Sequence, residues 1–243
     1  MKNTVFIIGL PRSGTSFLGN KLKCIEDSVY LEEPNHAWMY RNMHKGHDCL
    51  DDTDLTERKR AFLHKFFLDR PAQTIIEKTP SNCLRLRYIN AAFPNSKYIY
   101  ITRSPEDIKN SIFRKWTKEE DNNNHIIYKG NSSQRLRQFK IQVNKLISTP
   151  LVDLPYYLPK IKQELLFLAG RSRSYWGPRI PGYHQLISKY SVEEIIEKQV
   201  NYCIEKVESD LLTLPSSNIY NITFNELERC PDDTLISIRE FLF

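Results

Sequence analysis

Short runs of strongly apolar residues alternate along this chain with longer stretches in which apolar and charged residues are mixed. The apolar runs are rich in Val, Ile and Tyr and stand at residues 5–8, 29–31, 74–76, 98–102 and 218–224. Runs of this length and type are typical of parallel strands that are buried on both faces. We therefore predict an α/β fold with three layers, in which helices flank a mostly parallel central sheet.

The mixed stretches predict the helices of the outer layers. Apolar residues recur there at helical spacing, and several of the stretches begin with a capping residue or end before a proline. The predicted helices cover residues 54–69, 81–92, 132–147, 156–168, 191–214 and 232–243, and Ser104 with Pro105 starts another. A chain of 243 residues is enough for one well-buried domain of this class.

The first apolar run leads directly into a turn bracketed by glycines and then into a helix. Gly9 and Gly14 have the spacing of a P-loop, but Thr15 stands where a P-loop NTPase has lysine. Such a turn points free backbone N–H groups and the positive end of a helix dipole at one spot, which suits a phosphate or a sulfate. The cation here is Arg12, whose guanidinium can hold anionic oxygen atoms from inside the turn.

Charged residues follow three other predicted strands. Glu32 and Glu33 come after the second run, Lys78 after the third and Arg103 after the fourth. The carboxyl ends of parallel strands meet at one edge of a sheet, where ligands gather. We expect Lys78 to point into the same cleft as Arg12, and a glutamate there is a candidate general base. The alternative interpretation of either glutamate is a solvated loop acid or the N-cap of the next helix.

Two motifs resemble those of sulfotransferases that use 3′-phosphoadenosine-5′-phosphosulfate (PAPS). The sequence LPRSGTS at residues 10–16 is similar to their 5′-phosphosulfate loop. Arg103 with Ser111, eight residues further on, resembles their 3′-phosphate-binding element. The resemblance covers residues 4–116 and 216–243 and is strongest to the carbohydrate and tyrosylprotein branches of that family.

The resemblance implies a P-loop sulfotransferase fold and in-line transfer of a sulfuryl group from PAPS to an acceptor hydroxyl, without a metal ion. Glu33 lies 21 residues beyond Arg12, which is the spacing of the catalytic base in the tyrosylprotein branch. Glu32 and His36 are the fallbacks. Arg12 and Lys78 are implied to stabilise charge on the leaving phosphate and the sulfuryl oxygens. The residues implied to bind the nucleotide are Pro11, Arg12, Ser13, Gly14, Thr15, Ser16, Arg103, Ser111 and Lys115.

The resemblance also shapes the expected domain and acceptor. Residues 1–243 are expected to form one sulfotransferase-like domain, in which residues 117–214 are a helical region on the acceptor side, inserted between the nucleotide-binding segments. The loop at residues 171–182 is rich in Arg and aromatic residues, and it is expected to cover adenine, bind an acceptor sugar or plug the fold. The expected acceptor is a small molecule, a glycan or a glycolipid, with a saccharide hydroxyl favoured by the branch resemblance and a peptide tyrosine left open.

One departure from the family concerns the 3′-phosphate of the nucleotide. Many members have a Lys- and Gly-rich C-terminal loop that closes over this phosphate, and this sequence has no counterpart of it. We therefore expect Arg103 and Ser111 to clamp the phosphate, with help from Lys115 and from Arg173 or Arg179.

Composition fits this interpretation and leaves two other classes open. The net charge of +6 suits an anionic ligand, and the five cysteines lack metal-site spacing. The first apolar run is too short for a signal peptide or a membrane span, so we expect a cytoplasmic protein. A P-loop kinase or NTPase is one alternative, which the missing lysine disfavours. A non-catalytic nucleotide- or RNA-binding protein is the other, although no nucleic-acid partner is expected.

Overall fold

The computed structural model describes residues 2–129, 153, 155 and 175–243, and within them five strands form one parallel sheet. The order of the strands is β2-β3-β1-β4-β5, so the first strand lies at the centre. All four neighbouring pairs are parallel. The strands are β1 (Asn3–Ile8), β2 (Ser28–Glu32), β3 (Thr74–Lys78), β4 (Lys97–Thr102) and β5 (Ile219–Thr223). The predicted α/β fold with a parallel central sheet is confirmed.

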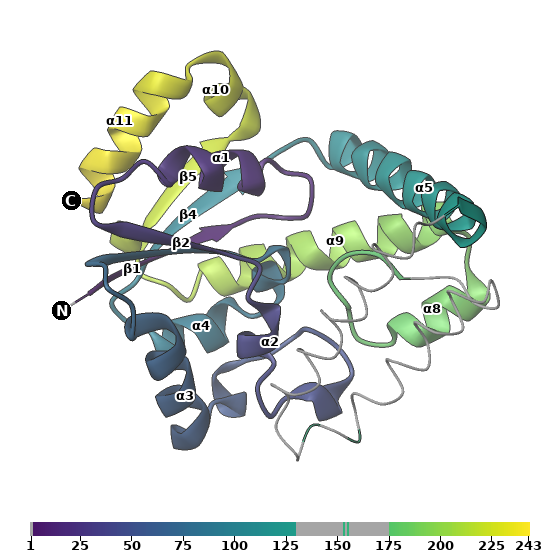
Figure 1. Ribbon diagram of the computed structural model, residues 1–243, viewed down its shortest axis with the longest axis horizontal. Coiled ribbons are helices and arrows are strands. Elements are labelled where there is room, and N and C mark those ends of the chain that lie inside the picture. The colour runs from purple at the N-terminus through teal and green to yellow at the C-terminus, as the bar shows by residue number, and fades with distance from the viewer. Residues whose placement is uncertain (1, 130–152, 154, 156–174) are drawn as a thin grey trace.

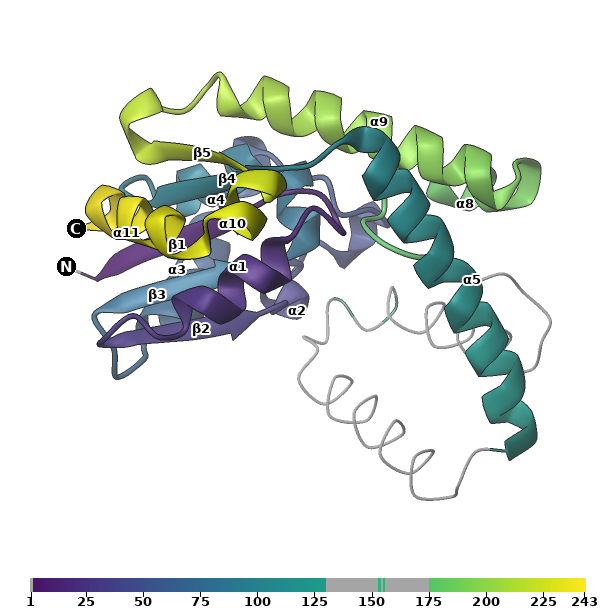
Figure 2. The same ribbon diagram turned by 90° about the horizontal axis from the view of Figure 1, so that it is seen from above.

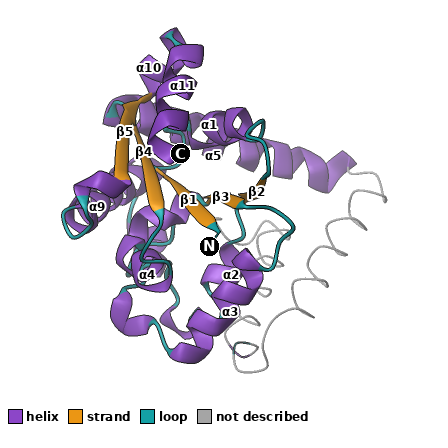
Figure 3. Cartoon of the chain, turned by 90° about the vertical axis from the view of Figure 1, so that its left-hand side faces the viewer, coloured by secondary structure: helices purple, strands orange, loops and turns teal. Residues whose placement is uncertain are grey.

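Helices cover both faces of this sheet (Figure 1; Figure 3). One layer contains α1 (Thr15–Leu22), α10 (Phe224–Arg229) and α11 (Pro231–Leu242). The opposite layer contains α2 (Asn35–Trp38), α3 (Glu57–Leu68), α4 (Leu86–Ala92) and α9 (Val192–Leu211). Short 3-10 turns are η1 (Met43–Lys45), η2 (Asp52–Asp54), η3 (Pro80–Leu84) and η4 (Ser216–Asn218).

Two further helices lie beyond the carboxyl ends of the strands. In the view from above, α5 (Pro105–Lys129) leaves the sheet as a long rod, and α8 (Tyr183–Lys189) lies beyond the end of the sheet near α9 (Figure 2). Helix α5 packs against α9 where the two helices cross. These helices frame the edge of the sheet at which the candidate residues were predicted to meet.

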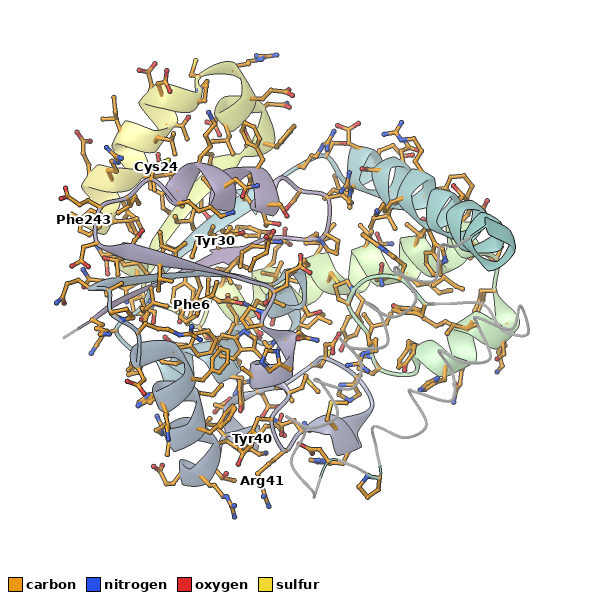
Figure 4. All side chains as sticks on the ribbon, in the orientation of Figure 1. Phe6, Cys24, Tyr30, Tyr40, Arg41 and Phe243 are labelled. Carbon is orange, nitrogen blue, oxygen red and sulfur yellow. The ribbon has the colours of Figure 1, made fainter. Side chains whose placement is uncertain are left out.

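The alternation of side chains along β1 divides the core into two halves. Val5 and Ile7 point toward α1, α10 and α11, whereas Phe6 and Ile8 point toward the layer of α2, α3, α4 and α9. Phe6 lies inside a group of aromatic rings under the sheet (Figure 4) and packs against Trp38 with ring centroids 5.7 Å apart. Both faces of the central strand are therefore buried, as its continuous apolar run predicted.

Four of the predicted helices differ from the structure or lie outside it. The stretch 81–92 is divided into the 3-10 turn η3 and the helix α4, because Arg85 between them has a non-helical backbone. The helix that we considered as following Glu33 is only four residues long. The predicted helices at 132–147 and 156–168 lie outside the described residues. Ser191 caps α9 in the expected capping box with Glu194.

Candidate active site

The turn between β1 and α1 has the geometry that its two glycines require. Gly14 caps α1 with a φ of 103°, and a Cβ at this position would lie 2.3 Å from the ring of Phe224. A Cβ on Gly9 would lie 2.6 Å from Oγ of Ser13. No larger residue fits at either position without a shift of its neighbours. Arg12 also has a positive φ of 69°, which is uncommon for a residue with a side chain.

This turn gathers hydrogen-bond donors and positive charge at one spot. The first N–H groups of α1 have no partner within the helix, and the first turn of the helix carries no acidic residue. Oγ of Ser13 is buried, and among the described residues it has no hydrogen-bond partner. Pro11 and Thr15 are buried in the turn, and Arg12 and Ser16 are exposed at its rim. A negatively charged group at the rim would meet the helix dipole, the backbone donors and these side chains together.

Lys78 lies beside this turn and joins it to the acids that follow β2. Its Nζ donates to Oγ of Ser16 at 2.8 Å and to Oε1 of Glu33 at 2.6 Å, and it lies 3.5 Å from Oε1 of Glu32. The lysine side chain is completely buried, whereas the Glu33 side chain is 53 % exposed. A buried ammonium group therefore holds a carboxylate that solvent and a ligand can still reach.

The parallel pairing of the strands explains this meeting. Lys78 is in register with Ile7 on β1 and with Glu32 on β2, so its side chain starts level with the end of each strand. Glu33 continues this pairing, because its N–H donates to the carbonyl of Lys78 at 2.8 Å. Its φ of 54° then turns the chain sharply toward α2. Glu32 and His36, the fallback candidates for the base, lie one residue before and three residues after Glu33. The ring of His36 packs against Phe66.

A second group of charges forms on the other side of β1. Arg103 directly follows β4, and Ser111 lies in the second turn of α5, where it is buried. Nε of Arg12 donates to Oγ of Ser111 at 3.0 Å, and Nη1 of Arg103 donates to the carbonyl of Arg12 at 3.2 Å. The Arg103 guanidinium also lies over the ring of Phe224, 4.7 Å from its centroid. Lys115 is exposed one turn beyond Ser111.

The structure thus brings together residues from four separate segments. The two groups meet at the turn, because Ser16 contacts Lys78 and Arg12 contacts Ser111. The predicted residues found in these groups or on the elements that frame them are Pro11, Arg12, Ser13, Gly14, Thr15, Ser16, Glu33, Lys78, Arg103, Ser111 and Lys115. The arrangement can hold an anionic group at the turn and present a carboxylate next to it.

Arg179 has a different neighbour from the one expected. Nη2 of Arg179 lies 2.7 Å from Oδ1 of Asp48. The backbone N–H of Arg179 donates to Oδ2 of the same carboxylate at 2.9 Å. Burial alone would raise the pKa of Asp48, but the charges of Arg179 and Arg85 and the hydrogen bonds from Arg179 lower it to about 2. Arg179 is therefore committed to a buried ion pair, and Arg173 lies outside the described residues.

Sequence reasoning passed over Glu77, the residue before Lys78. This carboxylate is completely buried and accepts hydrogen bonds from Trp38, Thr79 and Asn82. Burial raises the pKa of Glu77 to about 7, although the hydrogen bonds and the charge of Arg85 act in the opposite direction. The signal was present in the sequence, since an acid inside a strand that is apolar on both faces must be buried as well.

The described residues contain neither a membrane-spanning helix nor a metal-binding cluster of side chains. No helix in that part of the chain is long and apolar enough to cross a membrane. No cluster of three or more His, Cys, Asp or Glu side chains there could hold a metal ion.

Comparisons with known proteins agree with the fold. The family model described as "Sulfotransferase family" matches residues 4–147. A sulfotransferase from Alicyclobacillus acidocaldarius is similar in structure, with a TM-score of 0.55 and 15% identity over 100% of this chain and 81% of that one. A sulfotransferase domain from the curacin biosynthetic pathway has a TM-score of 0.53 and 12% identity over 100% of this chain and 74% of that one. No curated protein sequence matches.

Proposed function

Because this chain belongs to the sulfotransferase family, we propose that it transfers a sulfuryl group from PAPS to an acceptor hydroxyl. The observation that carries the proposal is the position of Lys78. This buried lysine bonds both to Ser16 at the rim of the anion-binding turn and to the exposed carboxylate of Glu33. A cation between an anion site and a candidate base is the arrangement that such a transfer needs.

The two groups of residues suggest how PAPS lies across the carboxyl ends of β1, β3 and β4. We assign the 5′-phosphosulfate to the turn from Pro11 to Ser16, where backbone donors and Arg12 face it. We assign the 3′-phosphate to Arg103 and Ser111, which already contact Arg12 from the other side. Lys115 lies one turn further along the same helix and supplies positive charge there.

The reaction follows from these positions. The acceptor oxygen attacks the sulfur atom and forms an O–S bond, while the bond from sulfur to the 5′-phosphate oxygen breaks. Glu33 takes the proton of the attacking hydroxyl. Arg12, Lys78 and the backbone donors of the turn stabilise the charge that grows on the leaving phosphate and on the sulfuryl oxygens. The products are the sulfated acceptor and 3′-phosphoadenosine-5′-phosphate (PAP), and no step uses a metal ion.

We assign the acceptor to the side of Glu33, because a base must lie within hydrogen-bond distance of the proton that it removes. A hydroxyl on a saccharide or a glycolipid is the acceptor that the resemblance to the carbohydrate branch supports. Glu33 lies 21 residues beyond Arg12, which is the spacing of the tyrosylprotein branch, so a peptide tyrosine belongs in the same test.

The decisive experiment is calorimetry of the whole chain with PAP in the presence of EDTA. We expect binding without metal, and at a PAP concentration 100 times the dissociation constant the fold gains about 2.7 kcal/mol. Mg-ATP and RNA serve as competing ligands for the kinase and RNA-binding alternatives. Sulfate transfer from labelled PAPS is then measured on glycan, glycolipid, phenol and tyrosine-peptide acceptors. Binding of ATP only with Mg²⁺, and no binding of PAP, would refute the proposal.

A further inference from the structure

Glu77 and Lys78 are neighbours on β3, but their side chains lie on opposite faces of the sheet. Successive residues of a strand point to opposite faces, and the contacts agree with this rule. Lys78 bonds to Ser16 of α1, whereas Glu77 bonds to Trp38 of α2. Both side chains are completely buried. A buried carboxylate costs free energy unless it is fully hydrogen-bonded. The donors around Glu77 therefore identify the segments that this side chain connects.

Three uncharged donors surround the two carboxylate oxygens of Glu77. Oε1 accepts from Nε1 of Trp38 at 3.1 Å and from Oγ1 of Thr79 at 2.5 Å. Oε2 accepts from Nδ2 of Asn82 at 2.6 Å. Thr79 and Asn82 belong to the segment directly after β3, and Trp38 is the last residue of α2. Glu77 therefore fastens α2 to the end of β3.

This attachment reaches Glu33 through α2. The helix begins two residues after Glu33, and the N–H of Asn35 donates to the carbonyl of Glu33 at 2.7 Å. With four residues, α2 is too short to be stable by its own hydrogen bonds. Its orientation depends on side-chain anchors, which are the indole of Trp38 on Glu77 and the amide of Asn35 on Arg85.

We propose that Glu77 is a positioning residue for sulfuryl transfer, which sets the carboxylate of Glu33 at its working distance from Lys78. The proposal rests on the function proposed above. Glu77 itself touches neither the nucleotide nor the acceptor, and it acts by fixing the segment that carries the base. Catalytic groups must be held within about 0.5 Å of the productive geometry. A misplacement of 1 Å costs a factor of about 100 in rate.

A graded pair of substitutions tests the attachment. Glu77→Gln keeps one acceptor oxygen and replaces the other with a donor, so we expect turnover to fall about tenfold. Glu77→Met keeps neither acceptor, and we expect a fall of about 100-fold, the cost of a 1 Å misplacement. PAP affinity, measured by calorimetry, stays within about twofold for both variants, since the hydrogen bonds to Glu77 come from Trp38, Thr79 and Asn82 and not from a residue assigned to the nucleotide.

A double-mutant cycle with Glu33→Gln separates positioning from a general loss of structure. If Glu77 acts through Glu33, then Glu77→Gln causes no further loss of turnover once the base has been removed. Multiplying losses in the double variant would show that Glu77 acts by another route and would overturn the proposal. A wild-type chain that transfers no sulfate at all refutes the proposed function instead, so the two failures differ.

Amide hydrogen exchange gives a readout that needs no activity. We expect Glu77→Gln to speed the exchange of residues 33–39 while the amides of β1 keep their protection. Asp210→Asn is the matched control, because Asp210 is another buried carboxylate that lies on α9, away from the site. It should leave both turnover and the exchange of residues 33–39 unchanged. Unchanged exchange in Glu77→Gln would also overturn the proposal.

A reciprocal exchange provides the rescue. In Glu77→Gln combined with Asn82→Asp, the new amide at position 77 faces a new carboxylate at position 82, which restores a donor and acceptor pair of the same shape. We expect this double variant to recover most of the turnover that the single Glu77→Gln variant loses. No recovery, with both variants folded and PAP affinity intact, would mean that the hydrogen bond to Asn82 does not carry the effect.

Discussion

The structure contains two ion pairs of nearly the same length that lie in very different surroundings. Lys78 is 2.6 Å from Glu33, and Arg179 is 2.7 Å from Asp48. The Glu33 side chain is 53 % exposed, whereas the Asp48 side chain is 3 % exposed. Distance alone therefore does not distinguish the two pairs, and the exposure of the acid does.

The difference in exposure decides what each pair can do. The exposed carboxylate of Glu33 can leave Lys78 and meet another proton donor, because water solvates it and Glu32, 3.5 Å from Nζ of Lys78, still faces the buried ammonium group. The carboxylate of Asp48 cannot leave Arg179 in this way, because it would then be an unpaired charge in the protein interior. We therefore expect changes at the first pair to affect the reaction and changes at the second pair to affect folding.

Glu33→Gln should give the largest effect. The substitution keeps the size of the side chain and removes its ability to take a proton. Turnover should fall by about 10² to 10⁴, which is the usual share of a general base. PAP affinity should stay within about twofold, because the base contributes mainly to the transition state. Transfer from labelled PAPS and calorimetry with PAP measure the two quantities, with Glu32→Gln as the matched control that does much less. Normal turnover in Glu33→Gln would move the role to Glu32 or His36.

Asp48→Asn should show the opposite pattern. It leaves the buried charge of Arg179 without its carboxylate, so the free energy of unfolding should fall by about 3 to 5 kcal/mol. Turnover per folded molecule should change by less than about threefold. Urea unfolding followed by fluorescence gives the first quantity, and an assay at a temperature where the variant is folded gives the second. A loss of turnover in a fully folded variant would contradict the distinction between the two pairs.

The buried acids can also be compared by their response to pH. Burial raises the pKa of Glu77 from 4.5 to about 7, so the native state holds a proton that the unfolded state releases between these values. Stability from this group is present below pH 4.5 and is lost as the pH rises through about 7, at a cost of about 3 kcal/mol. Asp48 has the opposite sign, because its pKa is lowered, and its contribution is lost as the pH falls from 3.8 through about 2.

Urea unfolding of the wild type and of Glu77→Gln at pH 5 and pH 8 checks the sign for Glu77. The glutamine cannot ionise, so the free energy of unfolding of the variant should rise relative to that of the wild type as the pH rises. A constant difference between the two proteins would show that Glu77 keeps one protonation state across this range.

Arg103→Ala should give the smallest effect and concerns a third, looser pair. Arg103 lies 3.8 Å from Asp107, and the acid is 59 % exposed, so this long pair does not commit the guanidinium to Asp107. Its loss should cost about 1.5 to 3 kcal/mol of PAP affinity, the range of a charged hydrogen bond. Adenosine 5′-phosphosulfate, which lacks the 3′-phosphate, should bind the wild type and the variant alike. Equal weakening of both ligands would assign Arg103 to the fold.

The sequence predicted which edge of the sheet the candidate residues share better than it predicted which of their atoms meet. Lys78 and Arg103 were expected at one edge because each follows an apolar run, and parallel strands end together. The partners of Lys78 could not be predicted from spacing. These partners depend on the register of β2 against β3 and on the positive φ of Glu33. No local sequence pattern near Glu33 predicts this φ.

The partners of Glu77 and Arg179 could not be predicted from the sequence either. Glu77 directly precedes Lys78, and the strand-end pattern indicates only the last charged residue of a strand. The pattern therefore predicted a role for Lys78 and none for Glu77. Arg179 was expected near a phosphate on account of its charge and its stiff loop. Its pairing with Asp48 joins residues 131 positions apart, and only the packed structure brings them together.

The strand order has a consequence for how this protein is made. Arg12, Glu33, Lys78, Arg103 and Ser111 all precede residue 112, and four of the five strands of the described sheet leave the ribosome with them. The outer side of β4 then has to wait for residues 219–223 before its hydrogen bonds are satisfied. An open strand edge of this kind recruits other chains. A nascent chain that already holds these candidate residues thus exposes the edge of β4, a strand that is buried in the folded protein, until β5 pairs with it more than a hundred residues later.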